Sequence, residues 1–136
     1  MAALTADRNT PSRTGERRSF PVKASTKIWA GALVCIDSSG RAVPGSTATG
    51  LIAVGRSPRV YDNSAGADGA VVGEFERGIY RFDNSTSTDA ITAAEIGSTC
   101  YVVDDHTVAK TNGSSTRSPA GTVFDVDALG VWVRFA

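Results

Sequence analysis

One stretch of the chain, residues 31–54, reads GALVCIDSSGRAVPGSTATGLIAV. It starts with an apolar segment at residues 31–36 and turns at the polar residues 37–40. A shorter apolar segment follows the turn, and a loop of small residues leads into a third, at residues 50–54. Apolar runs of this length, separated by Asp, Ser and Gly, predict β-strands joined by tight turns. We therefore expect a hairpin followed by a buried strand.

Later parts of the chain continue the pattern of short apolar segments and polar turns. Four further segments are apolar or alternate between apolar and polar side chains: residues 70–76, 78–82, 121–126 and 131–135. Alternation with a period of two is typical of a strand with one buried face. The composition agrees, because Val and Ile together number 20 while Leu and Glu number 4 each, Lys 3 and Gln none. A chain so poor in strong helix formers is not a helical bundle, a coiled coil or a doubly wound α/β domain.

One segment, residues 88–95, favours a short helix. Thr88 can cap its start, Asp89 lies in its first turn, and Gly97 can end it. The length of 136 residues corresponds to one domain. The sequence as a whole therefore predicts an all-β fold, a small β-barrel or β-sandwich of about eight to ten short strands, with one short helix and an extended N-terminal arm.

The order of segments in the first half of the chain recurs in the second half. Each half has an apolar segment that starts at a glycine, an Asp-containing turn, a short return, a small-residue loop and a further apolar segment. The first series begins at Gly31 and the second at Gly97, and Cys35 and Cys100 lie at near-equivalent places. A duplicated β unit with a period of about 65–70 residues accounts for this order. A simple meander of alternating strands produces the same order, so both interpretations stay open.

The formal net charge is zero, yet the two signs are separated along the chain. Residues 1–27 hold six basic and two acidic side chains, whereas residues 28–136 hold eight basic and twelve acidic ones. Residues 1–22 show no apolar period and are rich in Thr, Ser, Arg and Pro, which predicts an extended or disordered arm. The sequence thus indicates a basic arm at residues 1–22 and a β-rich domain at residues 23–136.

The arm supplies the candidate binding residues. They are four arginines and an adjacent aromatic–proline pair: Arg8, Arg13, Arg17, Arg18, Phe20 and Pro21. Arginines can pair with acidic groups of a partner, and Pro21 holds the residue before it in an extended conformation. Two roles for Phe20 stay open, namely anchoring on another surface and packing on its own domain.

The polar residues that could carry chemistry favour structural roles. The sequence lacks the GxSxG, HExxH, P-loop and GxGxxG motifs. The only histidine, His106, follows Asp104 and Asp105 between two apolar segments, which is typical of a hairpin tip. Asp125 and Asp127 lack the spacing of a calcium loop. We therefore expect no catalytic residues, no metal site and no cofactor.

Two further observations bear on the compartment. Cys35 and Cys100 both lie in apolar segments, so we expect two buried thiols and not a disulfide or a metal site. The start of the chain lacks the apolar core of a secretory signal, and the longest purely apolar run is residues 32–36. We expect a protein made in a cytoplasm, with no segment that crosses a membrane.

Several stretches resemble the capsid decoration (structural cement) proteins of tailed bacteriophages. They are KIWAGALVCIDSSGRAVP at residues 27–44, GLIAVG at 50–55, ITAAEIG at 91–97, CYVVDDHTV at 100–108 and GVWV at 130–133. The resemblance spans about residues 25–135 and lies in the order and character of the segments. It implies a β-rich protein that coats an assembled head, usually as dimers or trimers at sites between capsomers.

The resemblance and the charge pattern together predict a structural virion protein and not an enzyme. Its partners would be the major capsid protein and further copies of itself, on the outer surface of a capsid assembled in the bacterial cytoplasm, with no direct contact to nucleic acid or membrane. The arm would add contacts that hold neighbouring capsomers together.

The alternative is a nucleic-acid- or carbohydrate-binding β-barrel with a basic tail. The segment ERGIYRF at residues 76–82 is the only local mixture of basic and aromatic side chains in the body. The net charge of −4 over residues 28–136 disfavours this alternative.

Overall fold

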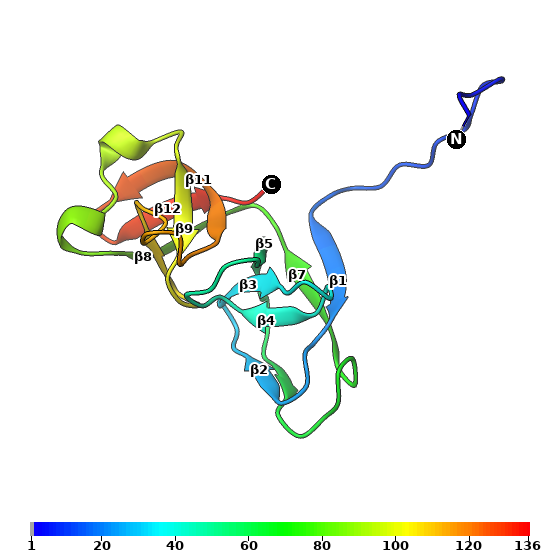
Figure 1. The fold of residues 1–136 in the computed structure, drawn as a ribbon, viewed down its shortest axis with the longest axis horizontal. Coiled ribbons are helices and arrows are strands. Elements are labelled where there is room, and N and C mark those ends of the chain that lie inside the picture. The colour runs from blue at the N-terminus through cyan, green and yellow to red at the C-terminus, as the bar shows by residue number, and fades with distance from the viewer. Residues whose placement is uncertain (1) are drawn as a thin grey trace.

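The computed structural model describes residues 2–136, and nearly all of its regular structure is β-strand (Figure 1). The strands are short and lie in chain order as β1 Arg17–Pro21, β2 Thr26–Ile28, β3 Leu33–Ile36, β4 Ala42–Pro44, β5 Ile52–Arg56, β6 Tyr61–Asn63, β7 Val72–Glu76, β8 Ile79–Asn84, β9 Thr99–Val102, β10 Thr107–Ala109, β11 Pro119–Asp127 and β12 Gly130–Arg134. Two single-turn 3₁₀ helices, η1 Ser87–Asp89 and η2 Ala93–Glu95, lie between β8 and β9. The prediction of an all-β fold that contains a small barrel is confirmed. Within residues 2–136, no helix is long and apolar enough to cross a membrane.

The strands form two five-stranded arrays that lie side by side (Figure 1). The first is an antiparallel sheet in the order β1-β7-β5-β3-β4, and its two edges meet at a single parallel bridge between Val22 and Ala42. The second is a closed barrel in the order β10-β8-β12-β11-β9, which the parallel pairing of β8 with β10 completes. Both arrays therefore bring their first and last strands together, the first through one bridge and the second through a full pairing.

The two arrays repeat one arrangement of strands. Written from the same end, their orders are β4-β3-β5-β7-β1 and β10-β9-β11-β12-β8. In the first array Val34 pairs with Gly55, and in the second Cys100 pairs with Gly121, so both partners are displaced by 66 residues. Each array also has a bulge next to this pair: one extra residue lies between Ala53 and Gly55 of β5, and one lies between Pro119 and Gly121 of β11. The prediction of a repeated β unit agrees with this topology, whereas a simple meander would not reproduce register and bulge together.

The structure moves the boundaries of the repeat. β1 occupies the place of β8, so the N-terminal unit covers residues 17–76 and the C-terminal unit covers residues 79–134. The two cysteines lie at near-equivalent places, as predicted, and differ by one position, because the register aligns Cys100 with Val34 and Cys35 with Tyr101. Adjacent residues of a strand face opposite sides, so Cys35 and Cys100 project from opposite faces of their strands.

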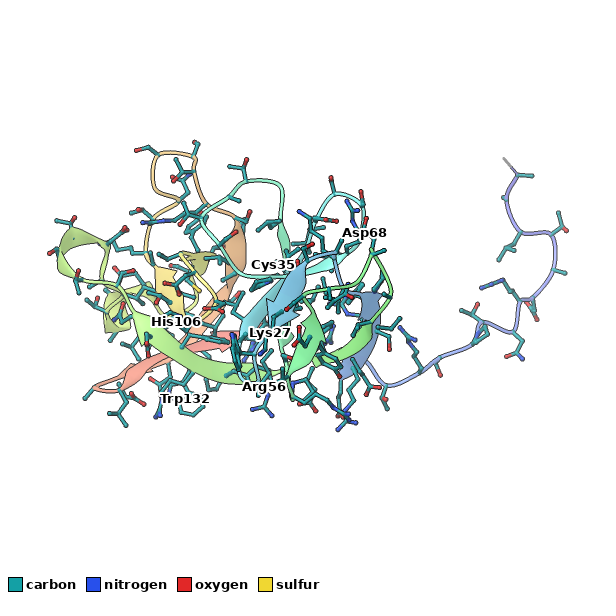
Figure 2. All side chains as sticks on the ribbon, turned by 90° about the horizontal axis from the view of Figure 1, so that it is seen from below. Lys27, Cys35, Arg56, Asp68, His106 and Trp132 are labelled. Carbon is teal, nitrogen blue, oxygen red and sulfur yellow. The ribbon has the colours of Figure 1, made fainter. Side chains whose placement is uncertain are left out.

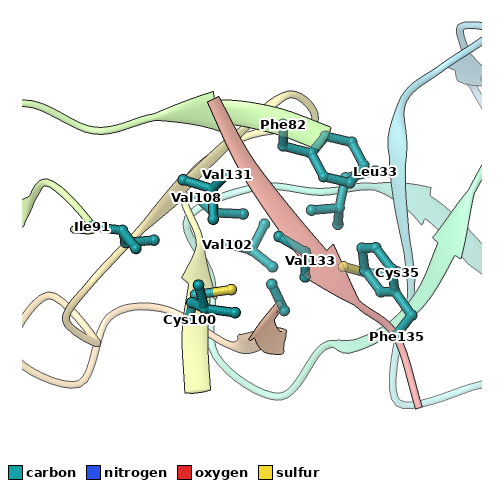
Figure 3. Close-up of a cluster of buried hydrophobic side chains, with 12 residues drawn as sticks. Leu33, Cys35, Phe82, Ile91, Cys100, Val102, Val108, Val131, Val133 and Phe135 are labelled. Atoms are coloured by element: carbon teal, nitrogen blue, oxygen red, sulfur yellow. The ribbon is translucent and has the colours of Figure 1, made fainter. Parts of the chain in front are cut away.

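The units share one of their two hydrophobic cores. The core of the N-terminal unit consists of Val22, Ile28, Ala32, Val34, Ala42, Val54 and Phe75. The larger core fills the barrel, and Leu33 and Cys35 of β3 belong to it although their strand lies in the other unit (Figure 3). Because the residues of β3 alternate between the two cores, this strand joins the units into one packed body.

The N-terminal unit carries an additional two-stranded sheet. β2 lies in the connection from β1 to β3, β6 lies in the connection from β5 to β7, and the two pair antiparallel. Buried Asn63 at the end of β6 holds this region, since its amide donates to the carbonyl oxygens of Val22, Lys23 and Ala67 at 2.9–3.1 Å. The corresponding connections of the C-terminal unit hold the 3₁₀ helices and a tight turn instead.

The predicted helix at residues 88–95 is wrong. The chain forms η1 and η2 there, and Ala90 between them has an extended backbone with ψ of 135°. Ile91 is buried in the barrel core, and Asn84 fixes it in place by accepting its N–H and donating to its carbonyl, both at 2.8 Å. Burial of a residue in mid-segment outweighs the weak helix propensity of a segment this short.

The boundary of the arm also differs from the prediction. Residues 17–21 form β1 and pair along their whole length with β7, so the exposed arm ends at Glu16. The pairing joins residues 51 to 59 positions apart, from Pro21 with Val72 to Arg17 with Glu76. Within β1, exposed residues alternate with the half-buried Arg18 and Phe20. This local pattern does not identify a partner strand so far along the chain.

Candidate functional site

The arm, residues 2–16, extends from the body as a separate exposed segment (Figure 1). Arg8 and Arg13 lie in it, and the only side-chain hydrogen bond described for either joins the Arg8 guanidinium to Thr10 at 2.7 Å. The arm meets the body at Glu16, whose carbonyl oxygen accepts the N–H of Arg77 at 2.9 Å. Arg8 and Arg13 are thus exposed residues of the segment before β1.

The other four predicted residues belong to β1. Arg17 reaches across to β7, where its guanidinium lies 3.4 Å from Glu74 and 3.2 Å from Glu76. The guanidinium of Arg18 lies 5.6 Å from the ring centroid of Phe20. Phe20 packs against the N-terminal core, so of its two open roles the structure shows packing on its own domain. Pro21 is exposed.

The arm residue Arg13 and strand β1 enclose a shallow groove of about 360 Å³ where they meet. Its lining consists of Arg13, Arg17, Arg18, Ser19, Phe20 and Glu74. Three arginines around one groove form a concentration of positive charge at the base of the arm. Because Arg17 is already paired with two carboxylates, Arg13 and Arg18 are the guanidinium groups best placed to meet an acidic partner.

His106 lies at the tip of the turn between β9 and β10, as expected. Its Nδ1 lies 2.9 Å from Asp105 and 3.1 Å from Asp104. The hydrogen bond to Asp105, followed by the charges of Asp104, Asp105 and Asp83, raises the pKa of His106 above its usual value. These carboxylates are half-buried or exposed, and an exposed group of this kind often stabilises a turn without holding an ion. The Asp104 oxygen also accepts the backbone N–H of His106, as expected of a residue that shapes a turn.

Both cysteines are buried free thiols, as predicted. Burial raises the pKa of Cys35 to about 12. Burial likewise raises the pKa of Cys100 to about 11. Because the thiolate is the nucleophilic form, neither side chain is suited to covalent chemistry in the folded protein.

The second surface of interest is the barrel outer face, the outward side of β8, β12 and β11. Arginines stack on aromatic rings here: Arg81 lies 5.5 Å from the ring centroid of Trp132, and Arg134 lies 5.1 Å from that of Phe124. Arg56 stacks on Tyr80 at 4.4 Å. A groove of about 330 Å³ is lined by both of these residues and by Arg81 and Trp132. Figure 2 shows Arg56 and Trp132 on the same side of the body.

The sequence drew attention to only part of this face. Residues 76–82 contain Tyr80 and Arg81, but Trp132, which stacks with Arg81, lies about 50 residues later, and Phe124 and Arg134 form a separate pair. The available signal was alternation, which places Trp132 and Arg134 on one side of their strand. The pairing of Trp132 with Arg81 across β12 and β8 needed the structure.

Comparison with known proteins adds no relative, since no protein-family model, curated protein or solved structure matches the chain.

Proposed function

We propose that the chain is a structural virion protein that binds the outside of an assembled phage capsid and stabilises it by clamping neighbouring capsomers. The observation that carries the proposal is the separation of an exposed arm, in which Arg8 and Arg13 lie beside Asp7 and Glu16, from a tightly packed β body. This division suits attachment to an extended surface, because the arm can follow a path across a partner while the body keeps its shape.

The arm provides the first half of the mechanism. Arg8 and Arg13 have exposed guanidinium groups, and Arg13 adjoins the groove at the base of the arm. Ordering a segment on binding costs about 2–5 kcal/mol, so the arm gains most from many contacts spread along its length. Guanidinium groups form paired hydrogen bonds with carboxylates, and the proposed surface for the arm is therefore an acidic strip of the capsid.

The body provides the second half. Its two units share a core through β3, so a force on one unit is carried to the other. When the arm holds one capsomer and the body holds its neighbour, the capsomers can part only after one set of contacts is lost. The second contact of such a linked pair forms at a high effective concentration, which strengthens the clamp beyond either contact alone.

Co-sedimentation with purified heads tests this proposal. Empty heads from a tailed phage that encodes this chain, but from which the protein has been removed, are mixed with the full chain and pelleted. We expect saturable binding and heads that resist heat-induced rupture better than undecorated ones. Binding that never saturates, or no binding, would contradict the proposal.

The groove beside Arg81 and Trp132 favours a second candidate, a nucleic-acid-binding barrel. Aromatic rings next to arginines are typical of surfaces that hold single strands. In this groove, however, guanidinium groups already lie over the rings of Tyr80 and Trp132, so a base would have to displace them. A gel shift with single-stranded DNA at low salt decides: tight binding that falls steeply with salt supports this candidate, and no shift removes it.

A further inference from the structure

The barrel outer face carries opposite charges at its two ends. Along β12 the outward side chains are Trp132 and Arg134, and Arg134 lies at the end of the strand beside Ile79 of β8. The other end of the face holds Asp127 of β11, opposite Gly130 at the start of β12. On β8, Arg81 is followed at the next outward position by Asp83. Between these ends Arg81, Trp132 and Asp125 lie in one row across β8, β12 and β11, so the charge changes from positive to negative obliquely across the face.

Among residues 2–136, four charges of this face, Arg81, Arg134, Asp83 and Asp125, form no ion pair within 4.0 Å. Two of them act at longer range. The pKa of Asp127 is lowered by its hydrogen bond from Trp132 and, at longer range, by Arg81. The pKa of His106 is raised by its hydrogen bond to Asp105 and, at longer range, by Asp83. Asp125 lies directly opposite Trp132 on the neighbouring strand. Together with Asp127 these residues give the face two cations and three anions, so it carries both signs of charge close together.

The same face also exposes apolar side chains. Phe124 is 47% exposed in the bulge of β11, and Leu129 is 72% exposed in the turn that leads to β12. Trp132 is half-buried, and its indole N–H is already satisfied by Asp127 at 2.8 Å. Aromatic and arginine side chains together, with apolar residues beside them, are typical of protein–protein contacts.

We propose that the barrel outer face binds a second copy of this chain about a two-fold axis that passes near Trp132. Half a turn about an axis that lies in the contact plane, at right angles to this oblique direction, places the positive side of one face on the negative side of the other. Arg134 and Arg81 of each copy then meet carboxylates of the other, and the Trp132 rings meet at the centre. A strongly acidic or strongly basic partner would leave charges of one sign unmatched on this face, whereas an identical copy matches both.

Size and ordering set the expected strength of this contact. Three short strands and one turn offer less area than the roughly 800 Å² per partner of a standard interface. The stacked arginines partly offset this, because their side chains are already held in place by Trp132 and Phe124 and lose less freedom on binding. We expect a dimer with a dissociation constant on the order of micromolar. The inference stands whether or not the larger partner is a capsid.

Variants that make the barrel outer face mainly acidic or mainly basic provide the test. One variant, Arg81→Glu with Arg134→Glu, makes the face acidic, and a second, Asp83→Lys with Asp125→Lys, makes it basic. Each should repel its own copies and associate at least about tenfold more weakly than the wild type. An equal mixture of the two should form a heterodimer, since each face now complements the other. The matched control is Arg59→Glu, which reverses an exposed, unpaired arginine stacked on Tyr61 in the N-terminal unit.

Sedimentation velocity over a range of concentrations reads the result. The expected pattern is a dimeric wild type and Arg59→Glu variant, monomeric double variants and a dimeric mixture. A monomeric wild type at every concentration, or double variants that dimerise as the wild type does, would overturn the inference. So would a monomeric wild type that binds single-stranded DNA and loses this binding in the acidic variant. If a double variant does not fold, salt decides: wild-type dimerisation must weaken as salt rises, and strengthening contradicts the proposal.

Discussion

The N-terminal and C-terminal units share strand order, register and bulges, yet only the C-terminal unit closes into a full barrel. In the N-terminal unit a single bridge from Val22 to Ala42 joins the edges. The connections differ too, because this unit builds the β2–β6 sheet from its β1–β3 and β5–β7 connections, and the C-terminal unit has no such sheet among its described residues. The comparison teaches that the core register defines the repeated unit, while the connections decide what else each unit carries.

The two hydrophobic cores also differ in size. The barrel core is the larger, and Leu33 and Cys35 reach it from the N-terminal unit. The smaller core of the N-terminal unit is assisted by hydrogen bonds such as those of Asn63. The N-terminal unit therefore depends on its neighbour for the burial of β3, and the two should unfold together.

The largest expected effect comes from Leu33→Ala, which removes a fully buried side chain from the shared core. The free energy of unfolding should fall by about 3 kcal/mol, the lost burial plus the cavity left behind. Denaturant unfolding should still show one transition. The control Leu4→Ala, at an exposed leucine of the arm, should change stability by less than about 0.5 kcal/mol. Separate transitions for the two units would show that the core does not couple them.

Two variants, Gly55→Ala and Gly121→Ala, test whether the two units are true repeats, because these glycines occupy equivalent places in β5 and β11. A Cβ atom at Gly55 would overlap the carbonyl oxygen of Glu76, and one at Gly121 would overlap that of Arg134. Each substitution should cost about 2–3 kcal/mol by forcing neighbouring strands apart, with Gly55→Ala the worse because its φ is +140°.

Thermal unfolding measures both glycine variants against Gly15→Ala, where the new Cβ would meet only the tip of the Arg77 side chain at 3.4 Å. The control should unfold like the wild type. If only one of the two strand glycines proved sensitive, the close approach of strands would not be a shared feature of the units.

Acid should weaken both units. Hydrogen bonds lower the pKa of Asp37, mainly from the Arg41 backbone, and that of Asp68, mainly from the Ala24 backbone. In the C-terminal unit Thr111, followed by Arg117, lowers the pKa of Asp89. A carboxyl with a lowered pKa in the folded state stabilises the fold above its unfolded pKa of about 4, and this contribution is lost as the pH falls through the folded value.

Denaturant unfolding between neutral and strongly acidic pH checks this sign. Stability should decrease on acidification below about pH 4, and Asp89→Asn should make the decrease shallower. The matched control is Asp7→Asn in the exposed arm, which should leave the profile unchanged. A protein that gains stability in acid would contradict the assignment.

The smallest effect concerns thiol reactivity, which reports how the cores open. The raised pKa values of Cys35 and Cys100 predict very slow reaction with a disulfide reagent near neutral pH until the protein unfolds. Single variants Cys35→Ala and Cys100→Ala separate the two signals. Equal protection is expected because both thiols lie in the same core. Early reaction of one thiol would reveal local opening of that part of the barrel.

The sequence predicts the local features of this fold well. Turns such as residues 37–40 carry their own signals, since Asp37 accepts the N–H groups of Ser39 and Arg41 within the turn. The repeat was visible in the spacing of glycines and apolar segments. The pairing of β1 with β7 was not, because strand partners far apart in the chain are chosen by the packing of the whole unit.

In the candidate site, too, local features can be predicted from the sequence and long-range contacts cannot. The exposure of Arg8 and Arg13 follows from composition, and the structure agrees. Arg17 and Arg18 carry the same composition signal, but their strand is held by β7 and two glutamates. The barrel outer face was hidden because its arginines and aromatic rings come from three strands, which adjoin only after the barrel has closed.

Deleting residues 2–15 tests most directly the claim that the arm attaches a self-sufficient body to a capsid. The deletion keeps Glu16, which binds Arg77, and all of β1. We predict an unchanged unfolding midpoint and binding to purified heads weakened at least about tenfold, since many arm contacts are lost. Heads that bind the shortened chain as tightly as the full chain would contradict the account.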